Sequence, residues 1–487
     1  MKIAVIGGGL GGMASALVLA KAGADVHIYE KNSMLGGKMQ RIELGAYQFD
    51  FGPNTITMPH VFQEVLAATG VNPDDYLEFI PLAEHMQNVS AEGETLIFST
   101  NKEAMKRQIA TFSQRDADRY ESFLEEITRI YELADRYFLR KTFFKKRDYV
   151  HPMLGAAILR VKPFQTFETF LKRYFEHPFI LQCFLRYGTY IGSSPYKMPA
   201  TFAMIAYLEL VQGVYYVKGG TSTIAKAFER RLQELGVHIH LNSHVTDVYS
   251  FNYRIHSLDV NGEVDEHVQE EFHAVIVNGD VLTHKKMLKY GNVETKYPTT
   301  SALVALVGLN KRLPQLAHHN VFYSATYEEE FQQLFTEQYA QDSTVYICNS
   351  SITDETVSPN GDNLLVLINA PAYTKKNAIS EAEAFSFIEK QLQRNGIDIE
   401  HAIVEKRIIT PQHIQNEFLA YRGALYGQNS NSFKQAFLRP RNRHPIYKNL
   451  YFVGGTVHPG GGSPLVVLGG MEVAKRIIRE QKKTPIN

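Results

Sequence analysis

The chain of 487 residues has only two cysteines, Cys183 and Cys348, and both stand in apolar surroundings. We therefore expect two buried thiols in a reducing compartment, and not a disulfide framework or a cysteine-based metal site. The histidines are scattered, and the adjacent pair His318 and His319 has no further ligands at metal-site spacing. The sequence thus predicts no metal site.

An excess of charge of one sign and long apolar runs are missing as well. The 51 basic side chains are matched by 51 acidic ones, which leaves no overall attraction to nucleic acid, and a hydrophobic content of 44% excludes a disordered chain. Residues 3–20 are uncharged and resemble a signal peptide, but the glycines within residues 7–12 would weaken an apolar helix. No other run of 18 apolar residues exists. We expect a cytoplasmic protein that is not integral to the membrane.

Glycine, by contrast, is concentrated near both ends of the chain. The spacing G-x-G-x-x-G occurs at Gly7, Gly9 and Gly12, directly after the apolar residues 3–6 and before the helix-compatible residues 13–22. In the dinucleotide-binding fingerprint the first glycine permits a tight turn, the second lets the backbone approach the pyrophosphate, and the third allows close helix–strand packing. The N–H groups at the start of the helix would then face the phosphates.

Two features downstream extend this fingerprint. Glu30 ends the next predicted strand, close to the position about 20 residues on where an acidic side chain accepts a hydrogen bond from ribose. Gly36 and Gly37, followed by the cation Lys38, offer a second close approach to a phosphate and favour FAD over NAD. The alternatives are a solvated strand end for Glu30 and an ordinary turn for the glycine pair.

The second glycine-rich segment covers residues 451–470. A predicted strand ends at Val453, and Ser463 as cap followed by Pro464 at the first position predicts the start of a helix. A helix start aimed at an isoalloxazine ring would stabilise the negative charge that develops there on reduction. The alternative is a glycine-rich loop that binds no ligand.

These motifs together resemble the flavin-dependent carotenoid desaturase family, which includes bacterial phytoene and dehydrosqualene desaturases and related carotenoid oxygenases. The resemblance extends from residue 1 to about residue 480 and rests on residues 7–12, 30, 36–38, 49–53, 217–220 and 451–470. It implies an α/β fold in which a Rossmann-like FAD-binding domain is interleaved with a mixed α+β domain. We expect residues 1–70, 213–295 and 435–487 in the FAD-binding domain, and residues 71–212 and 296–434 in the substrate and membrane-associating domain.

The resemblance also assigns residues to the cofactor. It implies that the backbone near Val245 meets the adenine, that Asn278 ends a strand beside the cofactor, and that the C-terminal block contacts the flavin. The full set of predicted FAD contacts is Gly7, Gly9, Gly12, Glu30, Gly36, Gly37, Lys38, Val245, Gly454, Gly455, His458, Gly461 and Pro464. A structural imidazole that bonds to the backbone is the alternative for His458. No residue is predicted to be the catalytic base.

Three shorter segments indicate which members of this family the chain resembles most. Residues 313–322, 421–427 and 460–462 look most like the diapocarotenoid (4,4'-diaponeurosporene) oxygenases of Gram-positive bacteria, which oxidise terminal methyl groups of a carotenoid to an aldehyde. The alternative is a desaturase of the same fold, in which a substrate C–H bond gives a hydride to FAD. Less favoured is an amine or porphyrinogen oxidase, whose version with a flavin-linked cysteine is weakened because no cysteine lies near residues 451–470. Also less favoured is a lipid-binding escort protein, because the glycine motifs are intact.

The middle of the chain is predicted to be helical and rich in aromatic residues. Residues 102–140 are predicted as a long helix in which Ser113 begins the capping pattern. Residues 138–149 mix basic and aromatic side chains, which fits a segment lying on the inner face of the cell membrane or a basic loop with buried rings. The many rings of residues 154–212 either line a lipid tunnel or fill a core.

Overall fold

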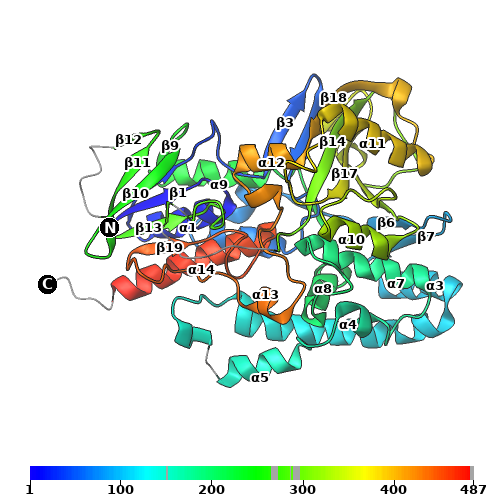
Figure 1. Cartoon of the computed structure of the whole chain (residues 1–487), viewed down its shortest axis with the longest axis horizontal. Coiled ribbons are helices and arrows are strands. Elements are labelled where there is room, and N and C mark those ends of the chain that lie inside the picture. The colour runs from blue at the N-terminus through cyan, green and yellow to red at the C-terminus, as the bar shows by residue number, and fades with distance from the viewer. Residues whose placement is uncertain (150–151, 265–271, 286, 289–296, 483–487) are drawn as a thin grey trace.

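The computed structural model describes residues 1–149, 152–264, 272–285, 287–288 and 297–482. A parallel sheet of five strands and a mixed sheet of seven strands lie side by side, with helices packed beneath both (Figure 1). None of the helices in these residues is long and apolar enough to cross a membrane. This architecture confirms the predicted α/β fold, whereas the domain boundaries stay a prediction.

The five-stranded sheet collects short strands from both ends and the middle of the chain. Its order is β19-β13-β1-β2-β9, and all neighbours run parallel. The strands are β1 (Lys2–Ile6), β2 (Asp25–Tyr29), β9 (His238–His240), β13 (Ala274–Val277) and β19 (Leu450–Phe452). Parallel strands buried on both faces read as continuous apolar runs, which is the pattern of β1 and β13.

Four helices cover one face of this sheet, and the first and last of them are in direct contact. They are α1 (Leu10–Lys21), α2 (Pro59–Ala67), α9 (Thr223–Glu234) and α14 (Ser463–Gln481). A Cβ atom on Gly470 of α14 would lie 2.2 Å from the Gly11 carbonyl oxygen of α1. Only glycine fits at this contact, which brings the two ends of the chain together.

An antiparallel sheet of three strands packs on the other face. It consists of β10 (Val245–Phe251), β11 (Arg254–Val260) and β12 (Glu263–Val264). Val248, Ile255 and Leu258 from this small sheet share a core with Ala4 and Ile6 of β1. The five-stranded sheet is therefore covered on both sides, as an α/β sheet requires.

In the seven-stranded sheet, β14 is the second strand from one edge and pairs with β18 and β17. In spatial order the strands are β18 (Ile403–Ile409), β14 (Ser301–Leu309), β17 (Asn363–Ala370), β16 (Val345–Asn349), β15 (His319–Phe322), β6 (Glu84–Val89) and β7 (Thr95–Ser99). Leu303 and Val307 of β14 pack with α11 (Glu381–Arg394), whereas Val304 and Leu306 pack with the hairpin β3 (Gln40–Leu44) and β4 (Tyr47–Phe51). This alternation buries both faces of β14.

The remaining elements form a helical layer below the seven-stranded sheet and a few connections (Figure 1). The helices of this layer are α3 (Lys102–Phe112), α4 (Gln114–Ala134), α5 (Pro152–Arg160), α6 (Phe167–Leu171), α7 (Pro178–Leu185), α8 (Met204–Leu210), α10 (Tyr327–Phe335) and α13 (Phe433–Phe437). In contrast, α12 (Pro411–Phe418) packs with β14 and with the hairpin of β3 and β4. A separate two-stranded antiparallel sheet pairs β5 (Phe79–Pro81) with β8 (Tyr215–Val217).

The long helix predicted over residues 102–140 is divided. Ser113 has extended backbone angles, and its side chain accepts a hydrogen bond of 3.2 Å from the Asp116 N–H. The predicted capping role of Ser113 is confirmed, but the same geometry ends α3 and starts α4, so a single continuous helix was the wrong expectation. A π-helical turn, Asp135–Leu139, ends the second helix.

The rings of residues 138–149 lie inside the protein. Phe143 and Phe144 are 2% and 3% exposed, and Phe143 packs edge-on against His458 with 4.3 Å between ring centroids. The Arg476 guanidinium lies over the Phe144 ring. The burial of Phe143 and Phe144 agrees with the basic loop with buried rings, and attachment of residues 138–149 to a membrane stays a prediction.

Candidate cofactor and substrate site

A cavity of about 380 Å³ opens at the carboxyl edge of the five-stranded sheet. Parallel α/β sheets bind their ligands at this edge. Most of the predicted cofactor residues line it: Gly7, Gly9, Glu30, Gly36, Gly37, Lys38, Val245, Gly454, Gly455 and Gly461. The structure thus brings the two distant glycine-rich segments to one cavity.

The two N-terminal glycine motifs pack backbone against backbone. Gly7 has a φ of +96°, and a Cβ atom on Gly12 would lie 2.3 Å from the Gly7 carbonyl oxygen. The Gly36 N–H donates a 2.9 Å hydrogen bond to the Gly8 carbonyl, and a Cβ atom on Gly37 would lie 3.1 Å from the Gly9 Cα. Gly12 does not line the cavity but allows the close packing expected of it.

The start of α1 has no side-chain cap. Its N-cap residue is Gly9, and no side chain accepts a hydrogen bond there. The first N–H groups of the helix therefore remain available at the cavity wall, together with the positive end of the helix dipole. This arrangement suits an anion such as a pyrophosphate.

Glu30 is buried and holds the glycine loop. It is 5% exposed, and its carboxylate accepts hydrogen bonds from the Gly8 N–H (2.7 Å) and the Asn32 N–H (2.9 Å). The solvated strand end considered from the sequence is therefore excluded. The carboxylate keeps lone pairs toward the cavity, so a bond to ribose stays a prediction.

We expect Glu30→Ala to weaken FAD binding by at least about tenfold, the equivalent of one lost hydrogen bond to a charged group. The variant also frees the Gly8 N–H, so the loop that approaches the phosphates loses its anchor. The measurement is the flavin absorbance per protein after purification and a titration of apoprotein with FAD. Glu30→Gln, which keeps one acceptor oxygen, should bind with intermediate affinity; full flavin content in Glu30→Ala would refute the role.

Asn278 connects the two glycine-rich segments. Its Nδ2 donates a hydrogen bond to the Gly7 carbonyl at 3.3 Å. Cβ atoms placed on Gly11 or Gly454 would lie 2.8 Å and 3.0 Å from its Oδ1. The Asn278 side chain therefore lies at the end of β13 between Gly11 and Gly454, and there is no room for a larger residue at either position.

Lys38 is a half-buried cation at the cavity wall. Its Nζ donates a 2.9 Å hydrogen bond to the Leu425 carbonyl. Burial lowers the pKa of Lys38, and the nearby Asp280 carboxylate opposes this. Burial raises the pKa of Asp280, which accepts hydrogen bonds from the Tyr421 and Leu282 N–H groups. Lys38 thereby connects the loop that contains Gly36 and Gly37 to Leu425, which follows α12. Its positive charge suits a phosphate.

The C-terminal glycine segment forms a turn and a second uncapped helix start. Gly462, with a φ of +108°, is the N-cap of α14, and no side chain caps the helix. The helix therefore starts at Ser463 with Pro464 in its second position, one residue earlier than the sequence predicts. Residues 461–463 line both this cavity and a second one beside it. Pro464 lines only the second cavity.

His458 points away from both cavities. Its Nε2 donates to the carbonyl oxygens of Phe138 (3.1 Å) and Lys141 (3.0 Å). Burial lowers the pKa of His458 to about 3, so the imidazole is neutral. The structural imidazole considered from the sequence describes this residue, and the predicted flavin contact by its side chain is not what the geometry shows.

Arg439 is a buried cation that the sequence analysis missed. It is 7% exposed, and its Nη atoms donate to the carbonyl oxygens of Tyr426 (3.4 Å), Gly455 (3.3 Å) and Gln428 (3.2 Å) and to Ser430 Oγ (3.4 Å). Burial lowers its pKa to about 10, which leaves it protonated at neutral pH. No carboxylate within the described ranges lies at ion-pair distance, so its charge remains uncompensated at the wall of the second cavity.

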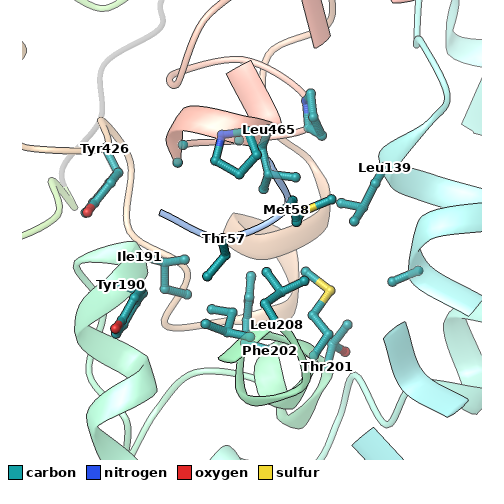
Figure 2. A pocket seen from close by; sticks show the side chains of 18 of the residues that line it. Thr57, Met58, Leu139, Tyr190, Ile191, Thr201, Phe202, Leu208, Tyr426 and Leu465 are labelled. Atoms are coloured by element: carbon teal, nitrogen blue, oxygen red, sulfur yellow. The ribbon is translucent and has the colours of Figure 1, made fainter. Parts of the chain in front are cut away.

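The second cavity, of about 280 Å³, is mainly apolar. Figure 2 shows Leu465 at the start of α14 across the cavity from Phe202 and Leu208, with Leu139 to one side. Other lining residues are Thr57, Met58, Ile158, Ile191, Met204 and Tyr426. Most rings of residues 154–212 fill the core instead, as in the Phe175–Phe184 stack at 4.2 Å. Most of these rings therefore belong to the core, a few residues of this region line the cavity, and the lipid tunnel stays a prediction.

One part of this cavity wall is charged. Arg186 donates from Nη2 to Glu209 Oε2 (3.0 Å) and from Nη1 to the Tyr190 hydroxyl (2.9 Å), and that hydroxyl donates to the other Glu209 oxygen. Glu209 is fully buried and Arg186 is 4% exposed. Burial lowers the pKa of the adjacent His85 to about 4, so this imidazole is neutral. This cluster is charge-balanced, and together with Arg439 it forms the charged part of a mainly apolar wall.

Comparisons with known proteins were made for the whole chain. The family model described as flavin containing amine oxidoreductase matches residues 10–478. The chain is 30% identical to a 4,4'-diaponeurosporene oxygenase of Staphylococcus haemolyticus (strain JCSC1435), over 98% of this chain and 97% of that protein. It is 33% identical to a 1-hydroxycarotenoid 3,4-desaturase of Flavobacterium sp. (strain P99-3), over 98% of this chain and 99% of that protein.

Solved structures agree on the fold at much lower sequence identity. An oxidoreductase from Methanosarcina mazei superimposes with a TM-score of 0.64 at 15% identity, covering 98% of this chain and all of that one. Putrescine oxidase bound to putrescine superimposes with a TM-score of 0.60 at 16% identity, covering 98% of this chain and 99% of that one. At these identities the likeness concerns the fold alone.

Proposed function

Because the chain belongs to the flavin containing amine oxidoreductase family, and is thus an FAD-dependent oxidoreductase, we propose that it oxidises a terminal methyl group of a diapocarotenoid to an aldehyde. The observation that carries this proposal is the junction of the two cavities. An apolar cavity meets the glycine-lined cavity at residues 461–463, where α14 begins. A long apolar substrate held there would present its end beside the cofactor.

The first cavity fits FAD. Glycine backbone lines it where the pyrophosphate would lie, and the uncapped start of α1 and the Lys38 ammonium supply the positive charge that phosphates need. Glu30 would hold the ribose, Val245 the adenine and Gly455 the ring region. When bound, FAD supplies the two-electron acceptor of the reaction.

The protein's own residues have three tasks in this proposal. The apolar side chains around Leu465 and Phe202 hold the polyene and exclude water. The uncapped start of α14 and the buried Arg439 place positive charge at the junction, where negative charge develops during the oxidation. No buried carboxylate or imidazole of the described residues stands free at the junction as a base, so we assign none.

The methyl oxidation balances with molecular oxygen as co-substrate. A methyl group and one oxygen molecule give an aldehyde and one water, so no further reductant is required. Support for this reaction comes from relatives of full length that are named as oxygenases of 4,4'-diaponeurosporene and 4,4'-diapolycopene, each about 30% identical.

Desaturation is the second candidate. The 33% identity to a 1-hydroxycarotenoid 3,4-desaturase is at least as high as the identity to the oxygenases. In a desaturation the substrate loses a hydride and a proton from neighbouring carbons, and no oxygen is incorporated. The same cavities serve both reactions, so the product must decide between them.

The deciding experiment is co-expression in cells that make diaponeurosporene or diapolycopene, followed by mass spectrometry of the pigments. Methyl oxidation adds one oxygen atom and removes two hydrogen atoms, and it leaves the polyene length unchanged. Additional double bonds with intact methyl ends would show that the reaction is a desaturation and not a methyl oxidation. Unchanged pigments together with oxidation of an amine would rule out both carotenoid reactions and favour an amine oxidase. A purified protein that binds no flavin would rule out both reactions and favour an escort protein.

We also propose that the protein attaches to the membrane surface through α5 and the residues after it. Met153, Leu159 and Phe164 are 53%, 66% and 74% exposed. Leu154 and Ala157 of the same helix line the second cavity. One helix thus offers apolar side chains to the bilayer on one side and to the substrate on the other, which suits a lipophilic substrate that leaves the membrane directly.

Replacing Met153, Leu159 and Phe164 together by serine should lower binding to anionic phospholipid vesicles at least about tenfold. Each of these side chains gains about 1.5–3 kcal/mol when fully buried, and tenfold corresponds to about 1.4 kcal/mol. Flotation with vesicles measures the effect. Val404→Ser, which removes an apolar side chain of similar exposure on β18, is the control and should bind as the unaltered protein does. Equal binding by all three proteins would place the attachment elsewhere.

A further inference from the structure

Four ligand-type side chains gather on one face at the edge of the five-stranded sheet, away from both cavities. Asp25 and His27 alternate on β2, and His238 and His240 alternate on the edge strand β9. The strands pair with His27 opposite His238. Residues two apart on a strand point to the same side, so all four side chains share one face.

Three of these side chains bring ligand atoms to one point. Asp25 Oδ1 lies 3.2 Å from His27 Nε2 and 3.5 Å from His238 Nε2. All three atoms lie within 4.8 Å of one another. Ligands at about 2.0–2.1 Å from a tetrahedral Zn²⁺ ion are separated from each other by about 3.4 Å. The two short separations therefore match the edges of such a site.

His240 holds one of the ligands in position. Its Nε2 lies 3.2 Å from His27 Nδ1, and the two rings are stacked with 5.5 Å between centroids. A histidine that binds a metal uses its second ring nitrogen in such a hydrogen bond, which fixes the tautomer and the ring orientation. Donation from His27 Nδ1 to His240 leaves the lone pair of His27 Nε2 directed toward Asp25.

The cluster is open to solvent. The side chains of Asp25 and His238 are 52% and 57% exposed, and that of His27 is 18% exposed. An ion can therefore reach the site without any opening of the fold. Two imidazoles and one carboxylate are the ligand set of three-ligand zinc sites, in which water takes the fourth position.

A second cluster, His318, His319 and Cys348, is different. Sequence spacing gave the histidine pair no further ligand, but β16 brings Cys348 next to it, and the ligand atoms of the three residues lie within 4.8 Å of one another. Each imidazole already has a hydroxyl partner through Nδ1, from Thr353 and from Tyr346. Burial raises the pKa of the Cys348 thiol, which disfavours the thiolate that a metal needs.

We propose that Asp25, His27 and His238 bind a divalent transition-metal ion, with Zn²⁺ as the ion that suits the ligands, and that His240 positions His27. The ion fastens the edge strand β9 to β2. The Glu30 N–H donates to the His240 carbonyl at 2.9 Å, so the fastened strand leads directly to the residue that holds the glycine loop. The proposal is independent of the substrate and of the reaction.

The test uses the full-length flavin-bound protein without a histidine tag. Zn²⁺ is titrated by calorimetry, and Co²⁺ is used as a spectroscopic probe because a site of this type gives visible absorption bands. We expect one tight equivalent of Zn²⁺ that displaces Co²⁺. Asp25→Asn and His238→Ala should each lower the affinity by at least about tenfold, the lower end of what loss of even an outer partner costs. His401→Ala, which removes an exposed histidine on a distant 3₁₀ turn, is the control.

Thermal unfolding distinguishes a metal-binding site from side chains that lie close together without binding an ion. Zn²⁺ should raise the unfolding midpoint of the unaltered protein and of His401→Ala, and should leave that of His238→Ala unchanged. Because His238 is exposed, its variant keeps the fold, which the flavin spectrum checks. Absence of stoichiometric binding, or binding that Asp25→Asn and His238→Ala do not weaken, would overturn the proposal and leave a group of hydrogen-bonded side chains only.

Discussion

Gly12→Val should yield a colourless protein that retains no FAD on purification. A Cβ atom at this position would lie 2.3 Å from the Gly7 carbonyl oxygen and 3.1 Å from the Asn278 Cβ. The first of these is backbone, so no side-chain rotation relieves the clash, and the loop must move away from α1. Overpacking of this kind costs about 3 kcal/mol, which corresponds to roughly a hundredfold loss of FAD affinity.

The matched control is Gly155→Val. Gly155 lies in α5, and a Cβ atom there would meet nothing within 4 Å. This variant should keep the flavin absorbance of the unaltered protein, since valine is a better helix former than glycine. A yellow Gly12→Val protein with full flavin content would mean that the first glycine motif does not bind the cofactor.

Glu209→Leu should lower the free energy of unfolding by about 3–5 kcal/mol. The substitution leaves the Arg186 guanidinium buried without its carboxylate partner, and an uncompensated buried charge has this cost. The Tyr190 hydroxyl also loses its acceptor. Urea denaturation of the flavin-bound protein, followed by far-UV circular dichroism and by flavin fluorescence, measures the loss.

The double variant Arg186→Met with Glu209→Leu tests the cause. Replacement of a whole buried ion pair by apolar residues of similar size is often neutral, so most of the lost stability should return. Tyr190 remains without a partner in this variant and accounts for a residual cost of about 1–3 kcal/mol. A double variant as unstable as Glu209→Leu alone would show that the loss comes from packing and not from the isolated charge.

The glycine motifs could be read from the sequence because their requirements are local. A tight turn with positive φ at Gly7 and the close approach at Gly12 depend on a few neighbouring residues, so the spacing alone predicts them. The meeting of the two ends of the chain followed from the resemblance of both segments to one family. The fold class was predictable for the same reason.

The polar residues of the second cavity could not be predicted from sequence spacing. Arg439 is held mainly by backbone carbonyls of residues 426–455, and every residue type has such a carbonyl. Arg186 and Glu209 come from different helices, and only the fold brings them together. No spacing in the sequence distinguishes these side chains from ordinary surface charges.

Two side-chain orientations that the sequence left open have a common physical origin. The sequence shows that a segment is near the cofactor or is rich in rings, but it does not show which way the side chains point. His458 lies in the C-terminal glycine block, yet its imidazole turns toward residues 138–141. Phe143 belongs to a basic segment, yet its ring is covered by that same histidine. Tertiary packing decides both orientations.

The contact between Gly11 and Gly470 has a consequence for how the protein matures in the cell. The wall of the cofactor cavity includes residues 454–466 as well as the first glycine motif, and the Gly470 backbone can approach the Gly11 carbonyl because Gly470 has no side chain. During synthesis, the first glycine motif emerges from the ribosome long before α14. We therefore expect FAD to be bound only after α14 has emerged and packed on α1, and removal of α14 should leave a protein without flavin.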